Sequence, residues 1–476
     1  MSGSTDFSAF SVPGGLIFKT IKIKPLLTAV SVGILLFLIN PFDLDGKRAF
    51  LFASLVMTII LWATEAVHKS WSSLYLLAVF ILCGKTPVLE VINFAWSDTM
   101  LLIITSQVLS IGIMNSGLIN SPVESLMRKT ADNTFLTLLL PYLLGVVLIF
   151  IVPQAFARVL ILGGIYDALL KVDNEEEKRA KQALIFNAFL GVCITSMMFS
   201  GGDVVLNYAA ISFSGPLVRE ALTFGNWARW MVVPTMITSV IVLVLVRLLF
   251  SKDFAGYHAG MIGEKTQTGE KLSPAKKFLT ILTVVVIITS WMTEPAHGIA
   301  PWISTLLGLF VMMALGLIKM KDFKNVNIHF LLFLTTAFSI GKVLGQAEIT
   351  NEIFVYLEKL IPAGDSAFYL PTIALMTMLL HMCIGSSVAT MSVVLPILMP
   401  MAAANNFQPQ LITLIVYIMV NIHFLFPFHH ATLLIGSGKN YYEDRFMLKT
   451  GIAMTLVSLP LVFLLYVPWW QFNGLK

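Results

Sequence analysis

The chain has 476 residues, of which 57% are apolar and only 12% are charged, and its mean hydropathy is +0.86. A soluble domain carries roughly 25% charged residues, so this composition excludes an ordinary globular fold and predicts a membrane protein. The formal charge of +5 comes from lysines and arginines scattered through short loops, which argues against nucleic-acid binding.

The chain opens with residues 1–24, which we expect to remain as a cytoplasmic segment because no small-residue cleavage site comes after the first apolar run. Runs of about 20 apolar residues, the length that crosses a bilayer, recur from there to the C-terminal end. They predict an all-α polytopic membrane protein with about eleven transmembrane helices. The spans are expected near residues 25–42, 48–67, 70–84, 99–118, 182–216, 225–251, 278–295, 296–319, 328–346, 411–438 and 446–470.

Two further apolar stretches, residues 134–170 and 368–402, are each interrupted in the middle by small or polar residues. The first interruption is Pro153-Gln154-Ala155, and the second is Gly385-Ser386-Ser387. Non-helical backbone at membrane depth is tolerated only where protein or a watery cavity surrounds it. We therefore predict two re-entrant hairpins whose tips mark a cavity.

The most polar connector, residues 252–277, is expected to be a cytoplasmic linker between two copies of one unit, residues 25–251 and 278–476. The lysines and arginines of short loops gather on one side if the N-terminus is cytoplasmic. With an odd number of spans, the C-terminus is then expected outside, and the two hairpins enter from opposite sides.

An internal repeat supports the two copies. The segment Trp62-Ala63-Thr64-Glu65-Ala66-Val67-His68 returns as Trp291-Met292-Thr293-Glu294-Pro295-Ala296-His297, and Ser110-Ile111-Gly112 returns at the same offset as Ser339-Ile340-Gly341. An odd number of spans per copy inverts the second one, and inverted repeats with broken helices are typical of secondary transporters. Because Thr, Glu and Trp are common at helix junctions, we expect neither copy of the first motif to bind substrate.

Arg158 and Asp203 are ionisable residues inside predicted spans, where a charge costs about 2.5–3.5 kcal/mol. Arg158 lies about one helical turn after the first tip, and its planar guanidinium suits a carboxylate or sulfate. It is alternatively a buried arginine satisfied by carbonyl groups or an acidic neighbour. Asp203 ends the interruption Ser200-Gly201-Gly202-Asp203, where it either coordinates a cation or neutralises Arg158.

His429 and His430 lie just after Pro427, which disrupts the tenth span. An unperturbed histidine titrates at about pH 6.5, so the pair is a candidate for proton coupling, although each is alternatively a structural histidine. At the second tip, Ser386, Ser387 and Thr390 offer hydroxyl groups beside free backbone, or simply allow close helix packing.

Taken together, these motifs resemble the divalent anion:sodium symporter family, which carries dicarboxylates, citrate or sulfate, within a wider superfamily of ion transporters. Trp62-Ala63-Thr64-Glu65-Ala66 is similar to the family's Trp-Leu-Thr-Glu-Ala signature. The segment Ser386 to Thr390, continuing to Leu395-Pro396-Ile397, is similar to its Ser-Asn-Thr-Ala-Thr hairpin tip. Gly436-Ser437-Gly438 and the segment Met447 to Gly451 resemble the family's residues after the broken tenth span.

The resemblance implies a scaffold domain that dimerises and a transport domain that moves as an elevator. It also implies that the two tips bind the substrate carboxylates and that sodium ions sit between the tips and the broken helices. By position, Pro153, Gln154 and Ala155 correspond to the first tip, and Ser386, Ser387 and Val388 correspond to the second.

The chain departs from the family pattern at these positions. Neither tip keeps its asparagine, Arg158 enters the first one, and the Thr-Pro-Pro-Asn breaks are replaced by Ser200 to Asp203 and by Phe428 to Ala431. We therefore expect no cofactor other than sodium, and even sodium coordination is in question. A fixed arginine can supply the positive charge that sodium supplies elsewhere, which leaves exchange or proton coupling as alternatives.

The leading hypothesis is a secondary active transporter, not an enzyme, that moves a small dicarboxylate or tricarboxylate, or a related anion, across the cytoplasmic membrane by symport or exchange, as a homodimer. The substrate contacts are assigned to Gln154, Ala155, Arg158, Ser386, Ser387, Val388, Thr390 and Thr432, and ion coupling is assigned to Ser200, Gly201, Gly202, Asp203, His429 and His430. One alternative is a cation/proton antiporter of the same superfamily. A remote alternative is a membrane-embedded metalloenzyme, although the sequence has no His-Glu-x-x-His motif.

Overall fold

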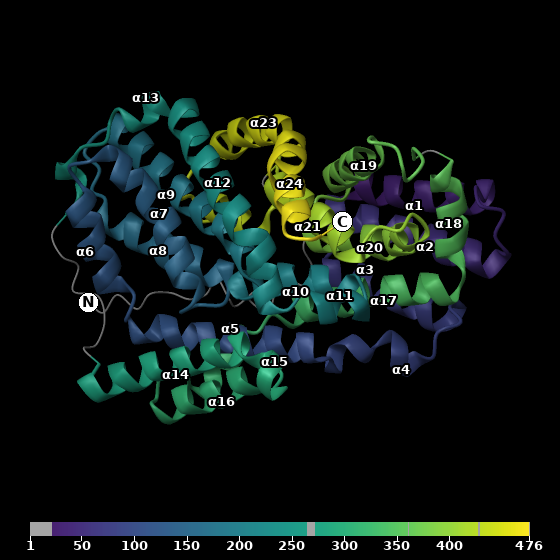
Figure 1. Cartoon of the computed structure of the whole chain (residues 1–476), viewed down its shortest axis with the longest axis horizontal. Helices are drawn as coiled ribbons and strands as arrows, with labels where there is room; N and C mark the ends of the chain where they lie inside the picture. Colours follow the sequence, from purple (N-terminus) through teal and green to yellow (C-terminus); the bar gives the residue numbers. More distant parts are fainter. Residues whose placement is uncertain (1–20, 264–271, 360, 427–428, 476) are drawn as a thin grey trace. The chain divides into compact units, whose positions relative to one another are not determined.

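The computed structural model describes residues 21–263, 272–359, 361–426 and 429–475. Within these ranges the regular secondary structure is helical, and one isolated β-bridge pairs Leu170 with Ile262 (Figure 1). Most of the predicted N-terminal segment 1–24, the centre of the linker 252–277, and the predicted helix breaker Pro427 with Phe428 lie outside the described residues.

Long apolar helices dominate the described chain and confirm the all-α membrane fold. Eight helical segments are long and apolar enough to cross a bilayer. These are α2 (Gly46–Thr64), α5 (Asp98–Ser116), α9 (Glu175–Thr195) with the adjoining 3-10 turn, α12 (Phe224–Leu249), α14 (Pro274–Met292), α17 (Ile328–Gln346), α20 (Ser387–Ala404) and α23 (Asp444–Leu461) with its extension to Phe472.

Seven shorter apolar helices accompany them in the described ranges. These are α1 (Ile23–Ile39), α3 (Lys69–Cys83), α7 (Thr134–Ile149), α10 (Val204–Phe213), α16 (Pro301–Ala314), α19 (Tyr369–Ile384) and α21 (Pro409–Ile422). The structure also contains α6 (Asn120–Thr130) and α18 (Ile349–Glu358), which the sequence analysis did not anticipate. How many of these helices cross the bilayer stays a prediction.

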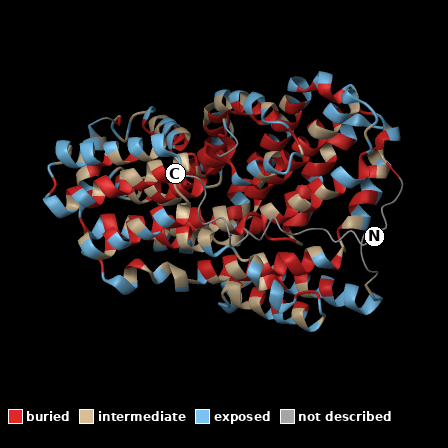
Figure 2. Ribbon diagram, turned by 180° about the vertical axis from the view of Figure 1, so that it is seen from behind, coloured by how far each residue is buried: buried red, intermediate tan, exposed pale blue. Residues whose placement is uncertain are grey.

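The helices form two compact units, and each unit draws on both halves of the sequence. Unit 1 comprises residues 1–104, 209–218 and 320–416, and unit 2 comprises residues 105–208, 219–319 and 417–476. In both units, buried residues occupy the helix faces that pack on neighbouring helices, whereas exposed residues occupy the outer faces (Figure 2).

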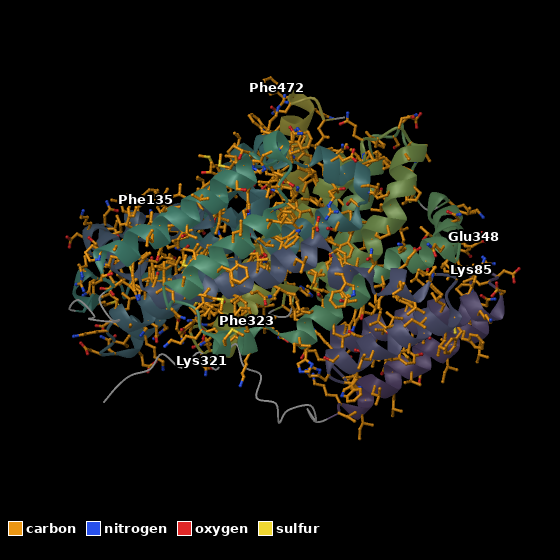
Figure 3. The ribbon with its side chains drawn as sticks, turned by 90° about the horizontal axis from the view of Figure 1, so that it is seen from below. Lys85, Phe135, Lys321, Phe323, Glu348 and Phe472 are labelled. Atoms are coloured by element: carbon orange, nitrogen blue, oxygen red, sulfur yellow. The ribbon has the colours of Figure 1, made fainter. Side chains whose placement is uncertain are left out.

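The outer faces carry large apolar side chains rather than charges. Phe135 near the start of α7 and Phe472 at the end of α24 (Val467–Phe472) project from their helices (Figure 3), and Phe472 is 83% exposed. On α14, Phe278 and Val286 are also exposed. Because lipid tails are the only apolar solvent available to such surfaces, these faces are those expected of a membrane protein.

In unit 2, helices α7 and α8 (Ala155–Leu169) pack on α9, with a non-helical break between α7 and α8 at residues 150–154. Glycines allow the closest of these approaches. A Cβ atom on Gly191 would lie 3.1 Å from the backbone of Pro141 and Tyr142, and one on Gly145 would lie 3.1 Å from the carbonyl oxygen of Gly191. Small residues at this crossing therefore let α7 and α9 touch through their backbones.

The described part of the connector after α12 is folded onto unit 2. Its residues form α13 (Ser251–Phe254) and a 3-10 turn (Ala259–Met261), and Gly263 N–H donates to Leu169 O (2.9 Å) just beyond them. Lys171 N–H donates to Met261 O (2.8 Å), and the Tyr257 hydroxyl donates to Ala131 O (3.0 Å). Residues 251–263, which we call the strap, thus fasten the ends of α6 and α8.

The repeated Trp-x-Thr-Glu-x-x-His motif makes two contacts that are shared by both copies. Thr64 and Thr293 each donate to the carbonyl oxygen four residues earlier, at 2.8 and 2.7 Å. His68 Nδ1 accepts the N–H of the residue two positions later at 3.3 Å, and His297 Nδ1 does the same at 2.9 Å. In these contacts the motif binds backbone groups at helix junctions, and His68 is the N-cap of α3 (Lys69–Cys83).

The contacts of His297 yield a stability prediction. We expect His297→Ala to lower the free energy of unfolding by about 1 kcal/mol, because the Ile299 N–H and the Ser290 carbonyl lose their hydrogen bonds to the imidazole. His297→Asn keeps a capping acceptor and should recover most of the loss. Thermal denaturation of the purified protein measures both variants, and equal midpoints for wild type and His297→Ala would contradict the capping role.

Candidate functional site

The residues assigned to the site fall into two groups, one in each unit. The first group is in unit 2 and consists of Gln154, Ala155, Arg158, Ser200, Gly201, Gly202, Asp203, His429, His430 and Thr432. The second group, at the start of α20 in unit 1, consists of Ser386, Ser387, Val388 and Thr390. Each group is described by itself.

The first tip lies at the N-terminal end of α8, where Gln154 is the residue that precedes the helix. The Pro153 carbonyl oxygen accepts a hydrogen bond from Val204 N–H at 3.4 Å, which ties the tip to the start of α10. Gln154 is only 6% exposed, and within the described chain its Nε2 group has no hydrogen-bond partner. The partial positive charge of the α8 N-terminus lies beside this donor.

Arg158 lies on the first turns of α8 and is fully buried. Its Nη1 donates to Gly145 O on α7 at 3.2 Å, and its Nη2 donates to Gly202 O in the break before α10. The guanidinium thus joins both arms of the hairpin to the broken helix. Among the described residues, Nε is the one guanidinium nitrogen that has no hydrogen-bond partner.

The helical path from α9 to α10 is broken at the predicted position. Two 3-10 turns, Ser196–Met198 and Ser200–Gly202, separate the helices. Gly202 cannot carry a side chain here, because a Cβ atom would lie 2.9 Å from the carbonyl carbon and 3.0 Å from the Cα atom of Ser196. The glycine is therefore required by close backbone approach.

Asp203 comes directly after this break and caps α10. Its buried carboxylate accepts hydrogen bonds from Val205 N–H (3.1 Å) and Leu206 N–H (3.4 Å). Its negative charge attracts the Arg158 guanidinium, although no ion pair between the two occurs within 4.0 Å in the described ranges. Asp203 therefore balances the charge of Arg158 at a distance rather than by direct contact.

Cys193 connects this cluster to the second broken helix. Its Sγ lies 3.9 Å from His430 Nδ1 and also makes a side-chain hydrogen bond with Thr432. His430 precedes α22 (Ala431–Gly438), and Thr432 lies in its first turn. Unit 2 thus gathers Arg158, Asp203, Cys193, His430 and Thr432 around the hairpin and two helix breaks.

His429 takes a different role from its neighbour. Its Nδ1 accepts hydrogen bonds from Leu425 N–H (3.0 Å) and Phe426 N–H (3.3 Å), so this nitrogen has no proton to give. Its ring stacks on that of His423, with the centroids 5.9 Å apart. These contacts hold the turn before α22 in place, while the proposed role of His429 in ion coupling stays a prediction.

The second tip is built like a helix cap. The Ser386 hydroxyl accepts Ala389 N–H at 3.5 Å, and the Thr390 hydroxyl donates to Ser386 O at 2.9 Å. Ser387 and Val388 are buried in the first turn of α20. Gly385, in the left-handed conformation (φ 67°), ends α19 and turns the chain between the two helices.

A small apolar hollow lies beside the first tip. Its lining is formed by Leu109, Ile151, Pro153, Val284, Ile287 and Ile288, and it is too narrow to admit a water molecule. No lining side chain is polar, so the hollow offers an anion nothing to bind. The capacity to bind a charged group rests on the polar cluster instead.

Several buried polar residues of unit 2 were missed by the sequence analysis. Cys193, Asn207, Tyr417 and His423 were not assigned a role there. Their signal in the sequence is weak, because each lies in an apolar helix or directly after one, where a single polar residue is ordinary. In the described chain, no three His, Cys, Asp or Glu side chains form a group that could hold a metal ion.

The family model of the sodium:sulfate symporter transmembrane region matches residues 19–475. The chain belongs to this family. It is 23% identical over 324 residues to a putative malate transporter, YflS, of Bacillus subtilis (strain 168), a match that covers 64% of this chain and 66% of that protein. It is 21% identical over 466 residues to a membrane protein of Cupriavidus necator, covering 90% and 88% of the two chains.

A third relative of this chain is an uncharacterized transporter of Schizosaccharomyces pombe, 22% identical over 490 residues. That match covers 98% of this chain but 54% of the other, so this chain spans about half of that relative and just under two thirds of the Bacillus protein. Among solved structures, the Alcanivorax borkumensis YdaH transporter, described as having an unusual topology, matches with a TM-score of 0.53 and 13% identity. The match covers 94% of this chain and 99% of that one, and it supports the transporter fold alone.

Proposed function

We propose that this chain is a secondary active transporter that carries a small dicarboxylate or tricarboxylate, or a related anion, across the cytoplasmic membrane. Membership of the sodium:sulfate symporter family establishes a membrane transporter. The relative named as a putative malate transporter supports a carboxylate as the substrate. The choice of substrate and the mechanism are our proposal.

One observation carries the proposal at the level of residues. Gln154 Nε2 and Arg158 Nε are buried N–H donors without a partner in the described chain, and both lie at the N-terminal end of α8. A buried donor left unpaired costs about 1–3 kcal/mol, so such groups in a native protein need a partner such as a ligand, an ion or water. Two N–H donors and a helix N-terminus suit the oxygen atoms of a carboxylate.

The second tip is proposed to contact substrate as well, through Ser386, Ser387, Val388 and Thr390. Ala155 and Thr432 are proposed as further substrate contacts. We further propose a homodimer that moves its substrate by an elevator motion, with a cytoplasmic N-terminus and the C-terminus outside.

Coupling is assigned to the broken helices. Sodium would be cargo here, and the carbonyl oxygen of Gly202 and the carboxylate of Asp203 already accept hydrogen bonds from N–H donors. Arg158 supplies fixed positive charge beside them, so the site has less need of a cation than one without an arginine. We therefore propose proton symport or exchange, with His430 and Asp203 as the titrating groups.

Uptake of labelled malate, succinate, citrate and sulfate into proteoliposomes tests the function. We expect saturable uptake of at least one carboxylate, driven by a pH gradient or by internal anion more than by a sodium gradient. Imposing the sodium and pH gradients separately distinguishes the two. Sodium-dependent proton flux without any anion would instead establish a cation/proton antiporter and refute the proposal.

A further inference from the structure

Asn207 is a buried polar residue on α10 that the proposed function does not use. It lies one helical turn after Asp203, whose carbonyl oxygen accepts Asn207 N–H at 2.9 Å. Its side chain is fully buried and reaches back over the turn that ends α9. A buried amide has to find donors and acceptors for all its atoms, so its partners reveal what it holds.

The Asn207 amide donates hydrogen bonds to carbonyl groups that have no helical partner at the break. Its Nδ2 donates to Ser196 O at 3.2 Å and to Phe199 O at 2.9 Å. The Phe199 carbonyl also accepts Gly202 N–H at 2.8 Å. The last carbonyls of a helix have no partner within it, and here one side chain satisfies two acceptors of the break.

Tyr417 fixes the orientation of this amide. Its hydroxyl donates to Asn207 Oδ1 at 2.6 Å, so Oδ1 must face the hydroxyl and Nδ2 must face the carbonyls. Trp227 of α12 stacks edge-on against the Tyr417 ring, with the centroids 5.0 Å apart, and its Nε1–H donates to Met197 O at 2.9 Å. The carbonyls of residues 196, 197 and 199 are thus all held by side chains.

The turn formed by residues 196–202 leads directly to Asp203 and to the contact with Arg158. Gly202, whose carbonyl oxygen accepts Arg158 Nη2, lies three residues after Phe199, and a Cβ atom on Gly202 would strike the Ser196 backbone. A shift of the turn therefore moves the groups that Arg158 contacts. Tyr417 lies on α21, the helix that ends just before the second break, so one hydrogen bond links both broken helices of unit 2.

We infer that Asn207 is a positioning residue for the anion site. It holds the turn 196–202 in the conformation that orients the Arg158 guanidinium, and Tyr417 holds Asn207. The inference rests on the proposed function for its effect on transport. Its structural part, the fixed turn, is independent of which solute the chain carries.

The decisive variant is Asn207→Asp, which keeps the size of the side chain but replaces two N–H donors with a carboxylate oxygen. That oxygen faces two carbonyl oxygens, which repel it, whereas a protonated carboxyl group has one O–H donor and restores one bond. Because burial beside two carbonyl oxygens favours the protonated carboxyl group, we expect the KM of the variant to exceed that of wild type at the same pH by about tenfold at about pH 9, and the two KM values to converge at about pH 6. Tyr417→Phe should raise the KM less and show no recovery in acid.

Asn187→Asp is the matched control. Asn187 is also fully buried, its Nδ2 donates to Leu138 O at 2.8 Å, and a tyrosine, Tyr142, donates to its Oδ1 at 3.4 Å. This amide joins α9 to α7 away from the break. We expect this variant to lose heat stability but to have the same KM as wild type at each of the two pH values. Equal KM changes in the two variants, or none in Asn207→Asp, would overturn the positioning role.

A second measurement does not need transport. With Cys83 and Cys383 replaced by serine, maleimide labelling reports the exposure of Cys193, whose carbonyl oxygen accepts the Ser196 hydroxyl at 2.6 Å. We expect faster labelling in Asn207→Asp than in wild type or Asn187→Asp, and slower labelling again in acid relative to a free thiol. If the chain moves no anion, the proposed function fails, and unchanged labelling separately refutes the fixed turn.

Discussion

Arg158→Ala is expected to abolish high-affinity anion uptake while leaving a protein that still inserts into the membrane. A hydrogen bond to a charged group contributes about 1.5–3 kcal/mol, so the affinity should fall by about 10- to 100-fold. Arg158→Lys keeps the positive charge but loses the planar fork that serves two carbonyls at once, so we expect it to restore little. Substrate-dependent thermal shifts and proteoliposome uptake measure both variants.

A charge-balanced double variant separates the two roles that Arg158 can have. If the arginine only neutralises Asp203, then removing both charges in Arg158→Met with Asp203→Asn should restore uptake to the level of Asp203→Asn alone. If the arginine binds the anion, the double variant stays defective. We expect the second outcome, because a neutral pair leaves no cation to meet the substrate. Recovery of uptake in the double variant would show that our assignment is wrong.

Gly202→Ala is expected to have the second largest effect. The new methyl group would collide with the backbone of Ser196, which cannot move without displacing the turn that Asn207 holds. Overpacking of this kind costs about 1–3 kcal/mol and should shift the carbonyl group that Arg158 contacts. We expect uptake to fall by about tenfold or more, together with a lower thermal midpoint.

Gly164→Ala is the control for this substitution. Gly164 lies inside α8, and no atom is found within 4 Å of the position its Cβ would occupy. Alanine is favoured over glycine inside a helix by about 1 kcal/mol, so this variant should be as stable as wild type or more so, with unchanged uptake. A similar loss of uptake in both variants would mean that the collision at residue 202 is not the cause.

The helices and their breaks could be predicted because each depends on residues that are close together in the sequence. Apolar runs located the long helices, and Pro153 and Gln154 within such a run located the first tip. The glycines of Ser200-Gly201-Gly202-Asp203 located the break between α9 and α10. The repeated histidines were expected at helix junctions, and their Nδ1 atoms lie there as caps.

The contacts of the site could not be predicted, because each depends on partners far away in the sequence. Asn207 meets Tyr417 across 210 residues, and Cys193 meets His430 across 237. For Arg158, the sequence left open whether carbonyls, Asp203 or substrate satisfy it. The structure shows two carbonyl partners and one guanidinium nitrogen without a partner in the described chain, an arrangement that depends on how closely the helices approach rather than on any motif.

The strap limits where this chain can be split into two separately expressed fragments. A polar connector near the middle of the chain is the obvious place to divide a transporter into separately expressed fragments. Here, however, the first part of the connector pairs its backbone with Leu169 and Lys171 and anchors Tyr257 at Ala131. A cut between Ser251 and Gly263 would detach these fastenings from the base of the hairpin, so a productive split has to come after Gly263.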